Sequence, residues 1–414
     1  SASLPELEYC LGHAGVSRLI TLPGHAASLA PLCAQLNITM VLHQDVITSP
    51  VVSLPSVAPQ RRAMMLSTSG TTSKPKGVVT TRQNISTQIT TLLGSWGWQN
   101  NDVIPLFLPL HHIHGIINVL CCALWQGATV HLYPRFEMNT ILDAVAKHTY
   151  TLFMAVPTIY VKILQALDDM EEAQRTLICQ GFADLRLTVS GSAACPVKLF
   201  EQWQTMTGQI FLERYGMTEI GMALSNPYTG ERRAGYVGLA LPGVSVQLFD
   251  EAHQLITTED TPGEIRIQGN NVFLEYWQNP VATRESFHEG WFCTGDVAVM
   301  ENGYFRIMGR MSVDIIKSGG YKLSALEIEG TLLTHEAIAE CAVIGVTDDT
   351  WGEAVCAFIV LKPGSQLDAD TLKQWCKQKM SPYKVPKHLL FPDSLPRNAM
   401  GKVTKPALRT LLAR

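Results

Sequence analysis

The sequence predicts an α/β protein: a large domain with parallel, helix-covered sheets and a β-rich segment, followed by a small α+β domain at the C-terminus. Apolar strands alternate with helices between about residues 102 and 216, which indicates a parallel sheet covered by helices. After Gly216 the pattern changes to short antiparallel strands, and from about Arg310 helices and strands mix again. A chain of 414 residues also exceeds what one hydrophobic core usually serves, so at least two domains are expected.

The predicted elements of the large domain follow one another in a regular order. Pro157 and Pro196 each begin a helix, because proline suits the first helical turn, and Gly127 ends one. The expected strands are residues 102–110, 128–133, 151–156, 185–189 and 210–214, and the expected helices are residues 115–125, 138–148, 157–167 and 196–207. Ligands of such sheets bind at the carboxyl ends of the strands.

Two further segments complete the predicted fold. Antiparallel structure is expected at residues 244–249, 263–268 and 296–308, the last with a turn at Glu301-Asn302-Gly303. The C-terminal part reads as helix, strand, strand, helix and strand over residues 325–334, 340–346, 354–361, 370–379 and 388–391. We place the domain boundary after Met311, so that residues 1–311 form the large domain and residues 312–414 the small one.

Composition and charge argue against several classes of protein. The chain has 32 Lys and Arg against 36 Asp and Glu, whereas proteins that bind nucleic acids or anionic membranes normally present a basic face. No apolar run reaches the roughly 20 residues that a membrane-spanning helix needs. The ten cysteines are scattered without a Cys-x-x-Cys pair, which fits reduced thiols better than a disulfide framework or a zinc site. We expect small-molecule partners and a monomer.

The first motif is a loop of hydroxyls, glycine and lysines at a strand end. Side-chain hydroxyls and backbone N–H groups without bulky side chains can wrap the phosphates of a nucleotide. The alternative is a solvated Ser/Thr/Gly linker. A kinase-type P-loop is disfavoured, because Lys76 is followed by Gly77 and not by Ser or Thr. The candidate phosphate-binding residues are Thr68, Ser69, Gly70, Thr71, Thr72, Ser73, Lys74, Pro75 and Lys76.

Three more motifs follow along the chain. Residues 213–219 supply an aromatic ring, a glycine, a hydroxyl and a carboxylate at a strand end, as adenine and phosphate-bound Mg²⁺ require. Residues 291–296, with Arg310 behind them, offer a carboxylate for ribose hydroxyls and a guanidinium for phosphate or ribose. Residues 396–402 place a lysine on a glycine-flanked loop, suited to neutralise charge that develops on a phosphate. Taken singly, each is also compatible with an ordinary surface turn.

Together, the four motifs, in this order and at this spacing, resemble the adenylate-forming superfamily, which includes acyl-CoA synthetases, firefly luciferase and peptide-synthetase adenylation domains. The resemblance covers nearly the whole chain. Residues 108–115, 153–160, 189–194 and 212–219 are most similar to malonyl-CoA synthetases of the mitochondrial acyl-CoA synthetase family. This resemblance implies a mitochondrial matrix location, with the cytoplasm as the alternative.

The resemblance implies a two-step reaction with ATP, Mg²⁺ and CoA. A carboxylate attacks the α-phosphate and releases pyrophosphate; the small domain, which is mobile in the family, then rotates, and the CoA thiol displaces AMP. For the nucleotide, the resemblance implies that residues 68–76 bind the phosphates, Glu219 with Thr218 binds Mg²⁺, Tyr215 binds adenine, Asp296 binds ribose, and Arg310 binds ribose and phosphate. Lys402 is implied to polarise the α-phosphate. In the small domain, Ser312 is the implied hinge, and Gly319, Gly320 and Lys322 form the CoA side.

Arg214 is the predicted determinant of the acid substrate. A dicarboxylic acid brings a second carboxylate that a bidentate guanidinium neutralises well, and an arginine at this place is typical of the malonate branch. The alternative is a structural pair with Glu213, although neighbouring residues on a strand point to opposite faces. His114, Ser190 and Ser192 are further candidates for the acid pocket, and His111 and His112 are interpreted as structural rather than as zinc ligands.

The sequence also departs from the family pattern. Ser67 and Ser73 replace the usual tyrosine and glycine of the phosphate loop, and a left-handed backbone at Ser73 would add strain of about 1 kcal/mol. Family members carry a substantial segment before the position that matches Ser1, so we expect an N-terminally incomplete large domain with exposed sheet edges. The alternatives to a malonate- or methylmalonate-activating enzyme are therefore a monocarboxylate–CoA ligase and an inactive short form that binds nucleotide only.

Overall fold

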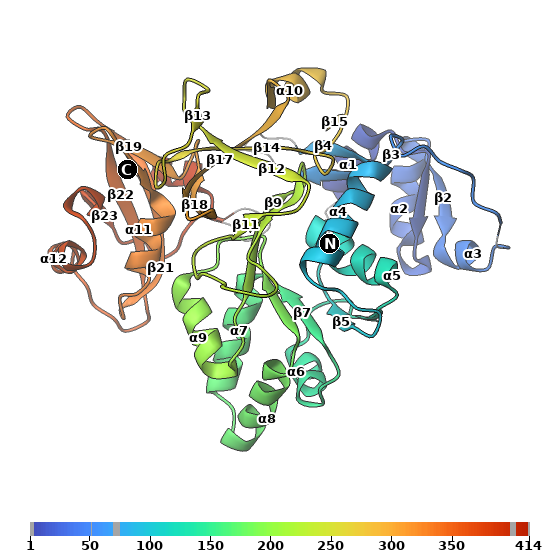
Figure 1. Ribbon diagram of the computed structural model, residues 1–414, viewed down its shortest axis with the longest axis horizontal. Helices are drawn as coiled ribbons and strands as arrows, with labels where there is room; N and C mark the ends of the chain where they lie inside the picture. The colour runs from blue at the N-terminus through green and yellow to red at the C-terminus, as the bar shows by residue number, and fades with distance from the viewer. Residues whose placement is uncertain (1–3, 51, 69–74, 398–402, 413–414) are drawn as a thin grey trace. The chain divides into compact units, whose positions relative to one another are not determined.

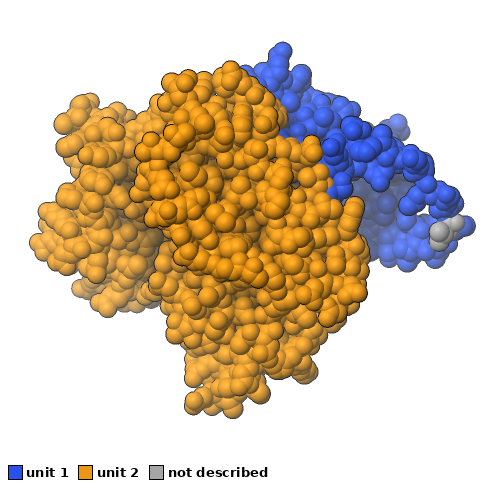
Figure 2. All heavy atoms as spheres, in the orientation of Figure 1, with its two compact units in different colours: residues 1–86, 272–285 blue, residues 87–271, 286–414 orange. Residues whose placement is uncertain are grey.

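The computed structural model describes residues 4–50, 52–68, 75–397 and 403–412 (Figure 1). The chain divides into two compact units, which Figure 2 shows in blue and orange: residues 1–86 with 272–285, and residues 87–271 with 286–414. Within the described residues no helix is long and apolar enough to cross a membrane.

The first unit contains two small sheets. A parallel pair joins β1 (Arg18–Thr21) to β2 (Thr39–Leu42), and the same unit holds helices that were not predicted. Those helices are α1 (Leu4–Ala14), α2 (Pro23–Gln35) and α3 (His43–Ile47). The second sheet has the order β15 (Glu275–Tyr276), β4 (Lys76–Thr81) and β3 (Arg62–Thr68). β3 and β4 form an antiparallel hairpin, so the predicted phosphate loop connects its two strands.

A five-stranded sheet forms the centre of the second unit. Its strands β7 (Leu152–Ala155), β8 (Leu187–Ser190) and β9 (Leu212–Met217) are parallel, and β10 (Gly221–Ser225) and β11 (Leu239–Ala240) continue the sheet antiparallel to them. Every residue of β7 and β8 is buried, as expected for strands covered on both faces. The predicted strands near residues 102 and 128 are β5 (Val103–Leu106) and β6 (Thr129–Leu132), which form a separate parallel pair.

Aromatic side chains pack together in this part of the second unit, and Figure 1 shows the helices that gather around these strands. These helices are α6 (Met138–Ala146), α7 (Pro157–Asp168), α8 (Glu172–Ala183) and α9 (Val197–Thr207). The ring of Trp203 stacks on Phe211 with centroids 5.2 Å apart, and Tyr160 and Phe182 meet Trp203 edge-on at 4.9 and 4.8 Å. The helix expected at 115–125 is instead a π-helix, η1 (His114–Cys121), that continues into α5 (Cys122–Gln126).

The antiparallel segment and the C-terminal segment complete the second unit. The first is a sheet of order β13 (Leu255–Ile256), β12 (Val244–Phe249), β14 (Gly263–Gly269), β17 (Trp291–Glu301) and β16 (Phe287–His288), with β18 (Tyr304–Arg310) paired to β17. The second has the order β20 (Tyr321–Ser324), β19 (Ile315–Ser318), β22 (Gly352–Leu361) and β21 (Ile338–Asp348), with β23 (His388–Leu390) parallel to β22. Helices α11 (Ala325–Leu332) and α12 (Ala369–Lys379) supply apolar side chains to the core of this second sheet.

Candidate active site

Three side chains from separate segments meet near the carboxyl end of β8. Arg214 projects from β9, Ser192 follows β8, and His114 begins η1. The Arg214 Nη2 donates to the Ser192 Oγ over 3.3 Å, and the same oxygen lies 3.2 Å from the His114 Nδ1. Arg214 and His114 are only 5% and 3% exposed. The structure thus joins three of the four residues that the sequence predicted for the acid pocket.

Arg214 is a buried cation for which the described residues provide no carboxylate. Its Nε has no hydrogen-bond partner among them, and no described acid forms an ion pair with it. Burial lowers the pKa of Arg214 to about 10, and the guanidinium remains charged at neutral pH. An isolated buried charge is unfavourable, so this arrangement is suited to an anionic ligand. The alternative pairing with Glu213 does not occur, because the Glu213 Oε1 accepts instead from the Gly235 N at 3.4 Å.

Gly191 provides the space that Arg214 occupies. A Cβ atom at residue 191 would lie 2.5 Å from the Arg214 Cζ and 2.5 Å from its Nε. Only glycine therefore allows the guanidinium to lie against this part of the backbone. Ser192, the next residue, adopts a left-handed backbone with φ of 71°, which is uncommon for serine. The fourth predicted acid-pocket residue, Ser190, is buried at the end of β8, close to Cys195.

The burial of Glu213 leads to a prediction about stability and pH. Burial raises the pKa of the Glu213 carboxyl to about 8, and the Gly235 N–H opposes the shift. The folded protein therefore binds a proton that the unfolded chain, with a pKa of about 4.3, releases. This contribution to stability is complete below about pH 4.3 and is lost as the pH rises through 8.

We expect Glu213→Gln to flatten the decline in the free energy of unfolding between pH 5 and pH 8, because glutamine stays neutral throughout. Urea unfolding of both proteins across this range measures the slope. Glu201→Gln, at an exposed position of α9, is the matched control and should leave the slope unchanged. An identical decline in wild type and Glu213→Gln would contradict the prediction.

The predicted nucleotide residues Tyr215, Asp296 and Arg310 form one connected group. The Tyr215 hydroxyl donates to the Asp296 Oδ2 over 2.6 Å, and the Arg310 Nε lies 2.9 Å from the Asp296 Oδ1. Asp296 and Arg310 are also direct partners in the register of β17 and β18. Burial raises the pKa of the Asp296 carboxyl, and the Arg310 charge opposes this effect. Burial also raises the pKa of Tyr215, and the Asp296 charge adds to that effect, so the hydroxyl keeps its proton as a donor.

Thr218 and Glu219 occupy the tight connection between β9 and β10. Met217 pairs with Gly221 across the hairpin, so residues 218–220 alone make the turn. A Cβ at Gly216 would lie 2.0 Å from the Gly221 carbonyl oxygen, which explains the glycine beside the turn. Glu219 is 5% exposed.

Mg²⁺ that is bound to ATP would need only a few ligands from the protein at this site. Among the described residues no group of three or more His, Cys, Asp or Glu side chains could hold a metal ion. Magnesium carried by ATP needs only one or two carboxylates, because phosphate oxygens and water complete its coordination. The Glu219 carboxylate is of the required type.

Part of the predicted phosphate loop lies in the first unit. Thr68 pairs with Lys76 at the end of the β3–β4 hairpin where the two strands are connected, and the Thr68 hydroxyl lies 3.5 Å from the Lys76 carbonyl oxygen. The Pro75 carbonyl accepts from the Tyr9 hydroxyl at 2.9 Å, and the Lys76 Nζ lies 4.7 Å from the centre of the Tyr276 ring. The remaining predicted residues, Ser69, Gly70, Thr71, Thr72, Ser73, Lys74 and the distant Lys402, lie outside the described residues.

The predicted hinge and CoA-side residues begin the C-terminal segment. Ser312 lies in the turn after β18, where the Asp314 Oδ2 accepts from the Arg310 backbone N at 3.0 Å. Gly319 and Gly320 form the two-residue turn between β19 and β20 with φ of 56° and 83°, values that favour glycine. The Lys322 Nζ lies 3.1 Å from the Glu251 Oε1.

Sequence reasoning missed a largely buried ion cluster near the predicted hinge residue Ser312. The Lys405 Nζ lies 2.6 Å from the Asp314 Oδ1 and 2.7 Å from the Glu329 Oε1. Lys405 follows the predicted catalytic Lys402 by three residues, and Asp314 contacts the backbone of Arg310. The spacing from Lys402 was visible in the sequence, but the acidic partners come from distant segments.

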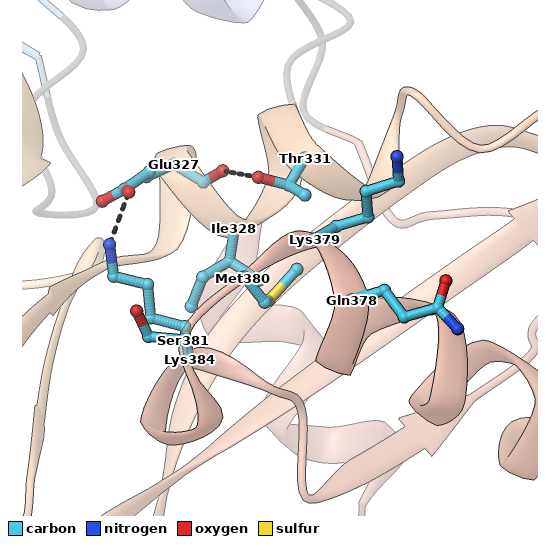
Figure 3. Close-up of a pocket in the computed structure, with 8 residues that line it drawn as sticks. All are labelled: Glu327, Ile328, Thr331, Gln378, Lys379, Met380, Ser381 and Lys384. Carbon is cyan, nitrogen blue, oxygen red and sulfur yellow. Dashed lines mark hydrogen bonds and ion pairs between the residues drawn. The ribbon is translucent and has the colours of Figure 1, made fainter.

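A cavity of about 400 Å³ in the C-terminal segment contains none of the predicted site residues. Figure 3 shows it between α11 and the turn after α12, with the Lys384 Nζ directed at Glu327. Its lining is polar and includes Thr331, Lys379 and Ser381.

Comparison with known proteins identifies the family. Residues 1–277 match the AMP-binding enzyme family and residues 327–402 match the AMP-binding enzyme C-terminal domain, so the chain belongs to this family. A mouse relative, "Malonate--CoA ligase ACSF3, mitochondrial", is 42% identical over 438 residues, which cover 97% of this chain and 75% of the relative. The family predicted from the four motifs is thereby confirmed.

Two solved structures are also similar to this chain. The crystal structure of ATP-bound MatB from Rhodopseudomonas palustris has a TM-score of 0.88 and 31% identity, over 99% of this chain and 82% of that one. A malonyl-CoA ligase in a ternary product complex with methylmalonyl-CoA and AMP has a TM-score of 0.68 and 36% identity, over 95% of this chain and 83% of that one. These similarities confirm the predicted fold class.

Proposed function

We propose that this protein is an AMP-forming acid–thiol ligase that makes malonyl-CoA from malonate, ATP and CoA. The observation that carries the substrate assignment is Arg214, a buried guanidinium without a carboxylate among the described residues. Malonate supplies the missing anion with its second carboxylate. Similar proteins from mouse and from solved structures are named as malonate–CoA or malonyl-CoA ligases. Methylmalonate is the proposed second substrate.

The reaction proceeds in two displacements at the adenylate. One malonate carboxylate attacks the α-phosphorus of ATP, pyrophosphate leaves, and malonyl-AMP forms. The CoA sulfur then attacks the acyl carbon, AMP leaves, and the thioester forms. Glu219, with Thr218, would hold the Mg²⁺ that ATP carries, and the bound ion would supply charge neutralisation at the phosphates.

We assign the residues of the chain as follows. Arg214 and His114 bind the spectator carboxylate of malonate, and Asp296 binds ribose with Tyr215 and Arg310 beside it. Residues 68–76 hold the phosphates, Glu219 with Thr218 holds Mg²⁺, and Lys402 neutralises the charge on the α-phosphate. Ser312 is the proposed hinge of a C-terminal domain that begins at residue 312, and Gly319, Gly320 and Lys322 are its CoA face.

We also propose that the protein acts as a monomer in the mitochondrial matrix. The named mouse relative is mitochondrial, which supports the location. Immunodetection in purified organelles and light scattering of the purified chain test these two statements.

The test of the proposed function is malonate-dependent ATP–pyrophosphate exchange by the purified chain, with methylmalonate and acetate measured alongside. Exchange with malonate, followed by malonyl-CoA formation when CoA is added, is the expected result. Preference for acetate would indicate a monocarboxylate ligase. Nucleotide binding without exchange for any acid would indicate an inactive form and would overturn the proposal.

Gly191→Ala provides a prediction about this acid site. Because the added Cβ would lie 2.5 Å from the Arg214 Cζ, the guanidinium has to shift. We expect kcat/KM for malonate to fall about 10²-fold, the size of effect that a displacement of about 1 Å produces. Gly94→Ala is the matched control, because a Cβ there meets nothing within 4 Å. Equal kinetics for both variants would contradict the prediction.

A further inference from the structure

Ser192 lies between the two basic side chains of the acid site. Its Oγ is 3.3 Å from the Arg214 Nη2 and 3.2 Å from the His114 Nδ1, and these are its two hydrogen-bond partners among the described residues. Its backbone is left-handed, with φ of 71°, and so departs from the extended conformation of β8. A serine in this conformation is uncommon, so a specific use of its side chain is the natural explanation.

The direction of the two hydrogen bonds follows from their donors. A guanidinium has only N–H groups, so the Ser192 oxygen accepts from Arg214. The single Ser192 proton then remains for the His114 Nδ1, the only other partner within the described part of the chain. A neutral imidazole that accepts at Nδ1 carries its own proton on Nε2.

His114 is held in its neutral form by its surroundings. Burial lowers the pKa of His114 well below its usual value, and the charges of Arg214 and His112 add to this effect. The imidazole is 3% exposed, and its Nε2 has no hydrogen-bond partner among the described residues. A buried N–H without an acceptor is unfavourable, and an oxygen of a bound acid would satisfy it.

We infer that Ser192 is a positioning residue: its hydroxyl accepts from Arg214 and donates to the His114 Nδ1, which keeps the His114 proton on Nε2 as a donor to the spectator carboxylate of the substrate. This inference rests on the proposed function and deepens it. His114 then binds malonate as a neutral donor beside the cationic Arg214, and Ser192 acts through His114 without being the main substrate ligand.

The first test reads the tautomer of His114 directly. Two-bond proton–nitrogen correlation spectra of the ¹⁵N-histidine-labelled full chain, without substrate, distinguish a proton on Nε2 from one on Nδ1. The chain has 12 histidines, so the His114 signal is assigned by its absence in His114→Gln. We expect the Nε2–H pattern in the wild type and its loss in Ser192→Ala. A wild-type Nδ1–H or doubly protonated pattern, or an unchanged pattern in Ser192→Ala, would overturn the inference.

A second variant controls for the possibility that Ser192→Ala misfolds. Ser192→Gly removes the hydroxyl and suits the left-handed backbone, so its fold is expected to be at least as stable as that of the wild type. Its His114 pattern should change in the same way as in Ser192→Ala. An unchanged pattern in a folded Ser192→Gly protein would also overturn the inference.

The second test compares two replacements of His114. Glutamine places an amide N–H near the position of Nε2, whereas asparagine places it near Nδ1. We expect His114→Gln to keep kcat/KM for malonate within about 10-fold of wild type, and His114→Asn to lose roughly 100-fold, mostly in the malonate KM. The KM for ATP should stay unchanged in both. Equal losses in the two variants would contradict an Nε2 donor.

The two tests separate this inference from the proposed function. If the wild type shows malonate-dependent exchange but His114 carries its proton on Nδ1, the proposed function is retained and the positioning role of Ser192 is overturned. No exchange with malonate would overturn the function and with it the role of His114 as a donor to malonate. In that case the tautomer still decides whether Ser192 orients the histidine.

Discussion

Replacing Arg214 by methionine is expected to lower malonate-dependent ATP–pyrophosphate exchange by roughly 10²- to 10⁴-fold in kcat/KM. The guanidinium is 5% exposed, so it interacts with a bound carboxylate under weak solvent screening. Removal of one partner of a buried charge pair costs about 3–5 kcal/mol, which corresponds to this range of rate. Methionine keeps an apolar side chain of similar length, so the loss reports the charge and its donors.

Two control variants complete this experiment. Arg214→Lys keeps the charge without the bidentate geometry, and an intermediate loss is expected. Arg232→Met is the matched arginine control, because Arg232 donates to the carbonyl oxygens of Ile210, Pro227 and Tyr228 and has a structural role. Arg232→Met should reduce stability and leave the malonate KM unchanged. Retention of full malonate activity by folded Arg214→Met would remove the basis of the substrate assignment.

The second large effect concerns stability and the buried ion pair of Asp102 and Arg186, which lie just before β5 and β8. Asp102 is 1% exposed, and its two oxygens accept from the Arg186 Nε and Nη2 at 3.1 and 2.6 Å. The same carboxylate accepts from the Thr151 hydroxyl and the Gln99 backbone N, both at 2.7 Å. Hydrogen bonds of Asp102 therefore connect the segments that precede β5, β7 and β8.

Asp102→Ala is expected to lower the free energy of unfolding by about 3–5 kcal/mol, because Arg186 and the Thr151 hydroxyl lose a buried acceptor. Urea denaturation followed by tryptophan fluorescence measures this change. Arg135→Ala is the matched control: Arg135 is 81% exposed and pairs only with Glu137 among the described residues, so a change below about 0.5 kcal/mol is expected. A change in Asp102→Ala as small as the one expected for Arg135→Ala would show that the Asp102 network contributes little.

The alternating apolar pattern between residues 102 and 216 was sufficient to predict the parallel sheet. Strands β7, β8 and β9 lie within two residues of their predicted starts, because buried parallel strands need continuous apolar runs. α8 was missed, because polar and apolar residues mix along it and only Ile178, Gly181 and Phe182 are buried. The hairpin of β19 and β20 was missed as well, since each of its short strands contains a lysine and a serine and so lacks a continuous apolar run.

The sequence by itself determined the family, because four motifs in a fixed order rarely coincide by chance. It also placed Arg214 next to the Tyr-Gly-Met-Thr-Glu segment, which suggested a dicarboxylic acid. Only the tertiary structure decided what surrounds that arginine. Gly191 leaves the space for the guanidinium, Ser192 bridges to it, and the His114 Nε2 has no partner among the described residues. These features come from segments up to 100 residues apart in the chain, 214 − 114. Local residue preferences do not predict such contacts, because packing between elements that are distant in the sequence decides them.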